Sequence, residues 1–204
     1  MYRKFVFIID EINRGEMSKI FGELFFSIDP GYRGKEGAIR TQYANMATEQ
    51  NEFDNVLKSE DFGHFFVPEN VYIIGTMNDI DRSVESMDLA MRRRFTFFEI
   101  KAKDTQKDIL AQLNDESKKT AEECMNKLNN AIWDDSKKEG ILSSDYQIGA
   151  AYFKKLKDLN NDFDLLWKYN LEPLLREYLR GQGDVENKLD QLENAYKNEP
   201  KTEE

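Results

Sequence analysis

Three groups of polar side chains in the first half of the chain have the types and spacing that phosphoryl chemistry requires. Asp10 and Glu11 directly follow an apolar run, Asn78 follows a second, and Arg92 and Arg93 precede a third. One carboxylate can hold Mg²⁺ through its water shell, and a second can activate an attacking water. An arginine can stabilise the charge that develops on a transferred phosphoryl group. Together these residues predict a metal–nucleotide site.

Each group also has an ordinary structural interpretation when it is taken alone. Carboxylates are common where a strand enters a loop, and an asparagine often stabilises a turn. A basic run suits the C-terminal end of a helix, where it meets the negative end of the helix dipole. The functional interpretation therefore depends on whether the surrounding elements bring the three groups together.

Those elements predict a layered α/β domain. Residues 5–9, 71–76 and 95–100 are short apolar runs, typical of strands buried on both faces of a parallel sheet. Residues 17–28 carry apolar side chains at helical spacing, and residues 86–94 predict a short helix. Because ligands of such sheets gather at the carboxyl ends of the strands, the polar residues at those ends are expected to lie together.

The composition changes near residue 102, and the rest of the chain is predicted to be helical. The predicted helices cover residues 104–119, 120–138, 144–159 and 162–180. The last segment is acidic and poor in apolar residues, which predicts a solvated helix or tail. We therefore expect an α/β domain at residues 1–102, a helical domain at 103–180 and an acidic C-terminal helix or tail at 181–204.

Composition excludes several classes of protein. The net charge of −10 argues against a chain that grips nucleic acid non-specifically by itself. Cys124 and His64 are the only residues of their types, which excludes a disulfide framework and a multi-cysteine zinc site. Cys124 is expected in a helix core, and His64 in a loop with no catalytic part. No apolar run approaches the roughly 20 residues that span a bilayer, so a cytoplasmic protein without a membrane partner is expected.

The three groups, taken in order, resemble the motifs of the AAA+ NTPases. Residues 5–11 are similar to the Walker B strand, residues 73–78 to the sensor-1 strand, and Arg92 and Arg93 to the arginine fingers. The sequences IDEINRG at 9–15, MNDID at 77–81 and LAMRRRF at 89–95 further resemble the McrB type. That type is the GTPase subunit of modification-dependent, 5-methylcytosine-specific restriction systems. The resemblance implies a partial AAA+ core, with strands 3, 4 and 5 of the parallel sheet, followed by an α-helical lid domain.

The resemblance also implies a role for each residue at the predicted strand ends. Asp10 would bind Mg²⁺ through water, and Glu11 would activate the hydrolytic water with Asn78 as the sensor. Asp81 belongs to the signature that helps to place the catalytic machinery. Asp10, Glu11 and Asn78 would also bind the nucleotide and its metal ion, with GTP as the implied nucleotide and ATP as the alternative.

The remaining motifs imply an assembly. Arg92 and Arg93 would act on the nucleotide of an adjacent subunit in a homo-oligomeric ring, hexameric by the resemblance, whereas Arg94 would pack or pair locally. Residues 146–153, YQIGAAYF, resemble a lid motif in which relatives often carry a histidine after the glycine. Ala150 stands at that position here, so a nucleotide contact through that histidine is not expected.

The phosphate-binding loop is missing from these 204 residues, because no G-x-x-x-x-G-K-[ST] sequence occurs. We therefore expect the chain to be inactive alone, as either the C-terminal half of a longer GTPase or a truncated product. The resemblance implies an McrC-like nuclease partner, and contact with DNA only through an N-terminal domain that this sequence lacks. Two alternatives stay open: an AAA+ ATPase of the MoxR-like type, and a non-catalytic assembly or inhibitory module of an AAA+ ring.

Overall fold

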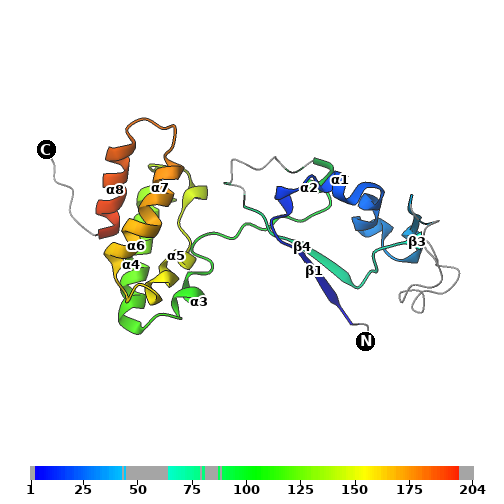
Figure 1. Ribbon diagram of the computed structural model, residues 1–204, viewed down its shortest axis with the longest axis horizontal. Coiled ribbons are helices and arrows are strands. Elements are labelled where there is room, and N and C mark those ends of the chain that lie inside the picture. Colours follow the sequence, from blue (N-terminus) through cyan, green and yellow to red (C-terminus); the bar gives the residue numbers. More distant parts are fainter. Residues whose placement is uncertain are drawn as a thin grey trace. The chain divides into compact units, whose positions relative to one another are not determined.

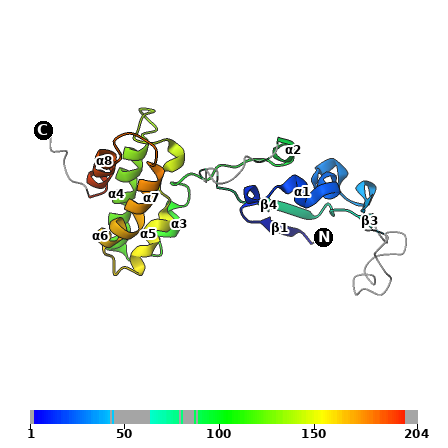
Figure 2. The ribbon, with the colours of Figure 1, turned by 45° about the horizontal axis from the view of Figure 1, so that its top comes forward.

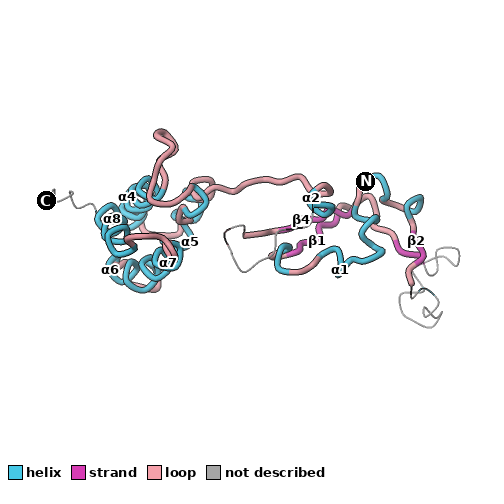
Figure 3. Tube along the Cα trace, turned by 90° about the horizontal axis from the view of Figure 1, so that it is seen from above, coloured by secondary structure: helices cyan, strands magenta, loops and turns pink. Residues whose placement is uncertain are grey.

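The computed structural model describes residues 3–42, 44, 64–78, 80, 87 and 89–197 of the 204. The chain divides into two compact units, residues 1–97 and 98–204. All strands that the structure describes lie in the first unit, and the described part of the second unit consists of helices and loops (Figure 3). None of the described helices has the length and apolar character needed to cross a membrane.

The first unit contains a two-stranded parallel sheet (Figure 1). Strand β1 (Phe5–Ile9) pairs with β4 (Val71–Gly75), and the register places Ile9 opposite Gly75. This pairing confirms that the first two predicted runs are parallel neighbours. A short antiparallel pair, β2 (Ile39–Arg40) with β3 (His64–Phe65), forms a separate sheet.

The structure corrects the prediction of a third strand at residues 95–100, which are irregular. Phe98 and Ile100 are 86% and 68% exposed. The described residues provide no strand beside this run, so its backbone groups find no ladder partners and extended pairing cannot form. An apolar run predicts a strand only when a neighbouring strand is there to pair with it.

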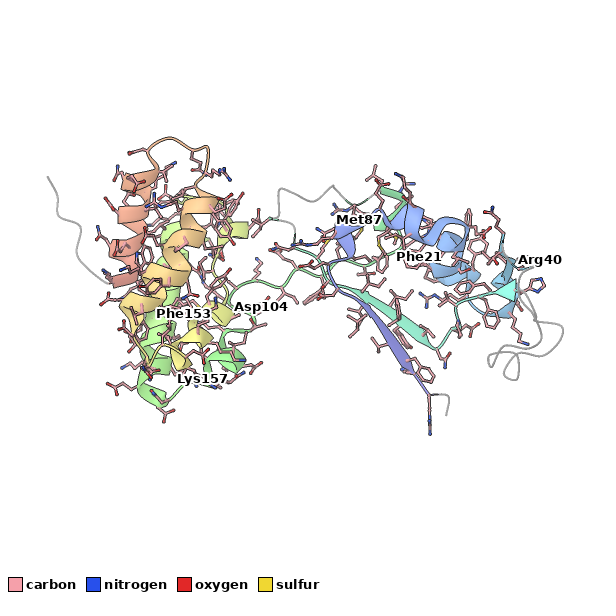
Figure 4. All side chains as sticks on the ribbon, in the orientation of Figure 1. Phe21, Arg40, Met87, Asp104, Phe153 and Lys157 are labelled. Carbon is pink, nitrogen blue, oxygen red and sulfur yellow. The ribbon has the colours of Figure 1, made fainter. Side chains whose placement is uncertain are left out.

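Two helices lie on one side of the sheet, but β1 is not buried on both faces as the sequence predicted, because its side chains from Phe5 to Ile8 are each more than half exposed. Figures 1 and 2 show α1 (Met17–Phe21) and α2 (Leu89–Arg92) on the same side of β1 and β4. The predicted helix at 17–28 forms as α1 followed by a 3₁₀ segment, Gly22–Ile28, with Gly22 at a φ of 50° at the junction. The buried core of this unit consists of Ile12, Met17, Ile28 and Met91, with Phe21 and Met87, labelled in Figure 4, among the partly buried side chains around it.

The second unit is a helical bundle around one continuous core. Its α-helices are α3 (Gln106–Leu110), α4 (Asp115–Ile132), α5 (Ala150–Lys154), α6 (Phe163–Leu166), α7 (Glu172–Tyr178) and α8 (Val185–Lys197). Short 3₁₀ turns at Ser144–Tyr146 and Lys155–Lys157 and a π-helical turn at Trp167–Leu171 connect or extend these helices. Phe153, labelled in Figure 4, is among the largest fully buried side chains.

Two predicted helices are interrupted in ways that local chemistry explains. The helix expected at 104–119 breaks before Asn114, whose side chain accepts a hydrogen bond from the Ser117 amide at 2.8 Å and so begins α4. The helix expected at 162–180 contains the π-helical turn, in which the Glu172 amide donates to the Trp167 carbonyl. Pro173 has no N–H to continue the regular ladder, which accounts for the wider turn.

The structure also corrects the prediction that the segment after residue 181 is a solvated helix or tail. Helix α8 packs against α4 and α7. Its residues Leu189, Leu192 and Tyr196 are buried in the core, and the Tyr196 hydroxyl donates to the Phe163 carbonyl at 2.9 Å. The acidic residues of α8 lie at other positions of the helix. The helix is therefore poor in apolar residues on average, although it has a narrow apolar stripe that is buried.

Candidate active site

The parallel pairing brings the polar ends of β1 and β4 together. Beyond the last paired residues, the Thr76 amide donates to the Ile9 carbonyl at 2.9 Å, and the Ile12 amide donates to the Thr76 carbonyl at 2.8 Å. The backbone ladder therefore continues past both strands. Asp10 and Glu11 lie within this stretch, next to the chain that leads to Asn78.

Thr76 is the residue that the sequence analysis missed. Its hydroxyl oxygen accepts a hydrogen bond from the Glu11 amide at 3.0 Å, and its hydroxyl donates to Asp10 Oδ1. The sequence does contain a feature that points to Thr76. It is the first hydroxyl-bearing residue after the apolar run of β4, at the same edge of the sheet as the two carboxylates. The resemblance to the AAA+ motifs gives a role to Asn78, two residues later, and none to Thr76.

The backbone of Glu11 has an unusual conformation. Its φ of 52° and ψ of 50° lie in the left-handed region, which non-glycine residues rarely adopt and which costs about 1–3 kcal/mol. Such conformations persist where surrounding bonds hold them, and here the hydroxyl of Thr76 holds the amide. The Glu11 carboxylate pairs with Arg14 Nε at 2.5 Å, and both side chains are about half exposed.

Asn78 is tied to the end of β1 through its backbone. Its carbonyl accepts a hydrogen bond from Asn13 Nδ2 at 3.1 Å, and its side-chain Oδ1 accepts from the Ile80 amide at 3.2 Å. With the side-chain oxygen engaged in this way, the amide nitrogen remains the group that can donate outward. Asp81, the other predicted residue of this motif, lies outside the described residues.

The three consecutive arginines have different environments. Arg94 packs its guanidinium over the Phe25 ring at 4.0 Å, donates to the Ala90 carbonyl at 2.6 Å and lies 3.9 Å from Asp29. Arg94 therefore has the local role expected of it.

The other two arginines lie at the surface. The Arg92 guanidinium lies 4.8 Å from the centroid of the Phe97 ring, and both Arg92 and Arg93 are exposed. Their charged groups are therefore accessible to a ligand or partner from outside the unit.

The residues at the strand ends fit a water-mediated magnesium ion. Thr76 occupies one oxygen of the exposed Asp10 carboxylate, and no hydrogen bond from the described residues occupies the other. In the described part of the chain, no three His, Cys, Asp or Glu side chains cluster as a direct metal site. One carboxylate acting through water, with phosphate oxygens completing the shell, is the usual arrangement for Mg²⁺ in nucleotide sites.

In the second unit, a buried amide clamps the segment predicted to be a lid motif. Asn129 Nδ2 donates to the Ile148 carbonyl at 2.9 Å, and the Ile148 amide donates to Asn129 Oδ1 at 2.6 Å. Gln147 Nε2 donates to the Trp133 carbonyl at 3.2 Å. Ala150 is completely buried in the core of this unit, so the alanine serves packing at that position.

The single cysteine and histidine have separate environments. Cys124 packs against the core of the second unit, and burial raises the pKa of its thiol. That environment suits a core residue rather than a nucleophile. His64 lies in β3, not in a loop as expected, and is exposed.

Comparison with known proteins assigns the family. Residues 1–95 match the family model described as the AAA domain (dynein-related subfamily), and residues 120–186 match the one described as McrB, alpha-helical lid domain. The chain belongs to the AAA+ proteins of the McrB type. This McrB-type chain combines a partial α/β AAA+ core with a helical lid, as the sequence predicted.

Two curated relatives are similar to this McrB-type chain. One is the Type IV methyl-directed restriction enzyme EcoKMcrB subunit of Escherichia coli K12, 36% identical over 86% of this chain and 37% of the relative. The other is the Type II restriction enzyme BsuMI component YdiS of Bacillus subtilis 168, 30% identical over 47% of this chain and 26% of the relative. The chain therefore spans well under half the length of either relative.

Proposed function

We propose that this chain carries the hydrolytic residues and the lid of a GTP-hydrolysing AAA+ subunit in a modification-dependent DNA restriction complex. The observation that carries the proposal is the bonded cluster at the strand ends, in which Thr76 links the Asp10 carboxylate to the Glu11 backbone. Asn78 is bonded to the same strand end through Asn13. A cluster of this kind, within a McrB-type AAA+ core, suits the hydrolysis of a nucleoside triphosphate.

Each residue of the cluster has a task in that reaction. The second oxygen of Asp10 would hold the water shell of Mg²⁺, which when bound would neutralise charge on the phosphates. Glu11 takes the proton of the attacking water once its carboxylate leaves Arg14, and the exposed pair is weak enough to open. The amide nitrogen of Asn78 donates to the water or to a phosphate oxygen. Asp81 is proposed to support this arrangement.

The phosphate cradle must come from outside these 204 residues, because the sequence has no P-loop. The exposed Arg92 and Arg93 are proposed to act on the nucleotide of an adjacent subunit in a ring, hexameric as the resemblance implies. Arginines that act between neighbours need heterologous contacts, which form a ring when the rotation between subunits closes. The isolated chain is therefore expected to be inactive.

The biological context rests on the relatives. Both are named as parts of restriction enzymes, and one is described as methyl-directed. We infer an McrC-like nuclease subunit as partner, DNA recognition through a domain outside this chain, and a cytoplasmic location. GTP is inferred from the McrB type, with ATP as the alternative.

The test is nucleotide hydrolysis, first by the 204-residue chain and then by the assembly that supplies a phosphate-binding loop. We expect no turnover from the chain alone, and magnesium-dependent turnover of GTP in preference to ATP from the assembly. Glu11→Gln should retain nucleotide binding and lose about 10²-fold or more in turnover. Glu16→Gln removes an exposed carboxylate that pairs with Lys19, and serves as the matched control. Wild-type turnover by Glu11→Gln would refute the assigned role.

A second candidate is a non-catalytic module that enters a ring of complete subunits. The exposure of Arg92 and Arg93 favours it, because these arginines could act on a neighbour's nucleotide whether or not this chain binds one itself. This candidate predicts that the chain changes turnover when it is added to a complete McrB-type subunit. It also predicts that Arg92→Ala abolishes the change, whereas Glu11→Gln does not.

A further inference from the structure

The geometry points to Thr76 as a positioning residue that sets both carboxylates of the site, Asp10 and Glu11, through a single hydroxyl group. This inference rests on the proposed function and adds to it a residue that acts through others. Thr76 touches neither metal nor nucleotide in the arrangement proposed above. Its effect would pass through the direction of one carboxylate and the backbone of the other.

The direction of each hydrogen bond follows from the donor inventory. A backbone N–H can only donate, so the bond from the Glu11 amide must end on a lone pair of the Thr76 hydroxyl oxygen. The hydroxyl has one proton, which is then free to point at Asp10 Oδ1. This bond fixes the rotation of the Asp10 carboxylate and leaves its other oxygen for the water shell of a metal.

The same hydroxyl holds the unusual backbone of Glu11. The backbone of Glu11 is in the left-handed region, and its amide donates to the Thr76 hydroxyl oxygen at 3.0 Å. The carboxylate of Glu11 then leaves the chain in a direction that an extended residue would not provide. Loss of the hydroxyl would therefore release the conformation that aims this side chain.

Thr76 can act in this way because its own position is fixed on both sides. Its amide donates to Ile9 and its carbonyl accepts from Ile12, so the backbone cannot rotate freely. Gly75 permits this approach, since a Cβ there would lie 2.8 Å from the side chain of Ile12. A β-branched residue also has few χ1 choices, which holds the hydroxyl toward the carboxylates.

The test separates the hydroxyl from the shape of the side chain. Thr76→Val keeps the β-branch and volume but removes the hydroxyl, whereas Thr76→Ser keeps the hydroxyl. In the assembly that supplies the phosphate-binding loop, we expect Thr76→Val to lower kcat by about 10–100-fold and to raise the Mg²⁺ concentration for half-maximal activity. The KM for nucleotide should change less than kcat, and Thr76→Ser should recover most of the activity. If Thr76→Val matches the wild type, or if Thr76→Ser is as impaired as Thr76→Val, the inference is wrong.

A second measurement needs no turnover. In the 204-residue chain, the Glu11 amide should be protected from hydrogen exchange in the wild type and in Thr76→Ser, and should exchange faster in Thr76→Val. Unchanged exchange in Thr76→Val would overturn the inference whatever the kinetics. If the wild-type assembly hydrolyses neither GTP nor ATP, the proposed function fails and the catalytic part of the inference fails with it. The exchange result would then still decide whether Thr76 holds the Glu11 backbone.

Discussion

Replacement of Asn129 by alanine should destabilise the helical lid more than its polar character suggests. Asn129 lies in α4 and is 1% exposed, and its amide bonds both the N–H and the C=O of Ile148. Ile148 is itself buried, and no other partner from the described residues bonds its backbone. Truncation therefore leaves two buried backbone groups without partners.

The magnitude follows from those two groups. Each unsatisfied backbone group costs about 1–3 kcal/mol, which gives a loss of about 2–6 kcal/mol for the pair. Alanine favours a helix interior over asparagine by at most about 0.7 kcal/mol, so propensity offsets only a small part. For a unit of this size, about 2 kcal/mol would lower Tm by about 8–16 °C.

The assay can isolate the lid because both tryptophans of the chain, Trp133 and Trp167, lie in the second unit. Thermal unfolding followed by tryptophan fluorescence thus reports on that unit alone. Asn130→Ala, an exposed position one residue further along α4, is the matched control and should leave Tm nearly unchanged. A shift for Asn129→Ala no larger than for Asn130→Ala would refute the reasoning.

Three further predictions test packing and charge. Leu192→Ala should cost about 2–5 kcal/mol by fluorescence-monitored unfolding, because this side chain of α8 is completely buried, whereas exposed Asp190→Ala should be nearly neutral. Arg94→Ala should destabilise the first unit by about 1–2 kcal/mol in circular-dichroism melts, through loss of the stacking on Phe25, and Arg94→Lys should not restore it. Burial raises the pKa of Tyr178 to about 12 from its ordinary 10, so the folded state binds this proton more tightly. The stability that the protonated Tyr178 contributes is fully present below pH 10 and should be lost as the pH rises from 10 to about 12. In Tyr178→Phe, the free energy of unfolding should no longer fall for this reason over that range in an alkaline unfolding titration.

The site could be predicted from sequence where the chemistry is local to a strand end. Apolar runs that end in Asp10, Glu11 and Asn78 predicted two parallel strands with polar residues at one edge, and β1 and β4 pair in that way. The sequence could not show that Glu11 has a left-handed backbone or that Thr76 bonds it. Those features depend on the register between β1 and β4, which brings together Glu11 and Thr76 from positions 65 residues apart, and no local pattern encodes that register.

In the helical unit, the sequence predicts that helices form but not where they end or which faces they bury. Helix formers were recognised, but the ends of the helices were set by single residues, such as Asn114 and Pro173, whose effects appear only when their neighbours are known. The average composition of α8 predicts a solvated helix, although a few apolar residues at helical spacing are enough to bury one face. Spacing was the better guide there than polarity.

The strand-end cluster and the sheet of the first unit depend on different forces for their stability. The strand-end cluster is held by short-range hydrogen bonds, because Thr76 and Asn13 connect β1 to the segment after β4 within the described residues. The sheet beneath it is a two-stranded pair whose β1 side chains from Phe5 to Ile8 are each more than half exposed. Such a pair is marginal in water until its apolar faces are covered. A segment or partner that covered these faces would stabilise the sheet without having to form the strand-end cluster, because the hydrogen bonds of Thr76 and Asn13 already hold that cluster.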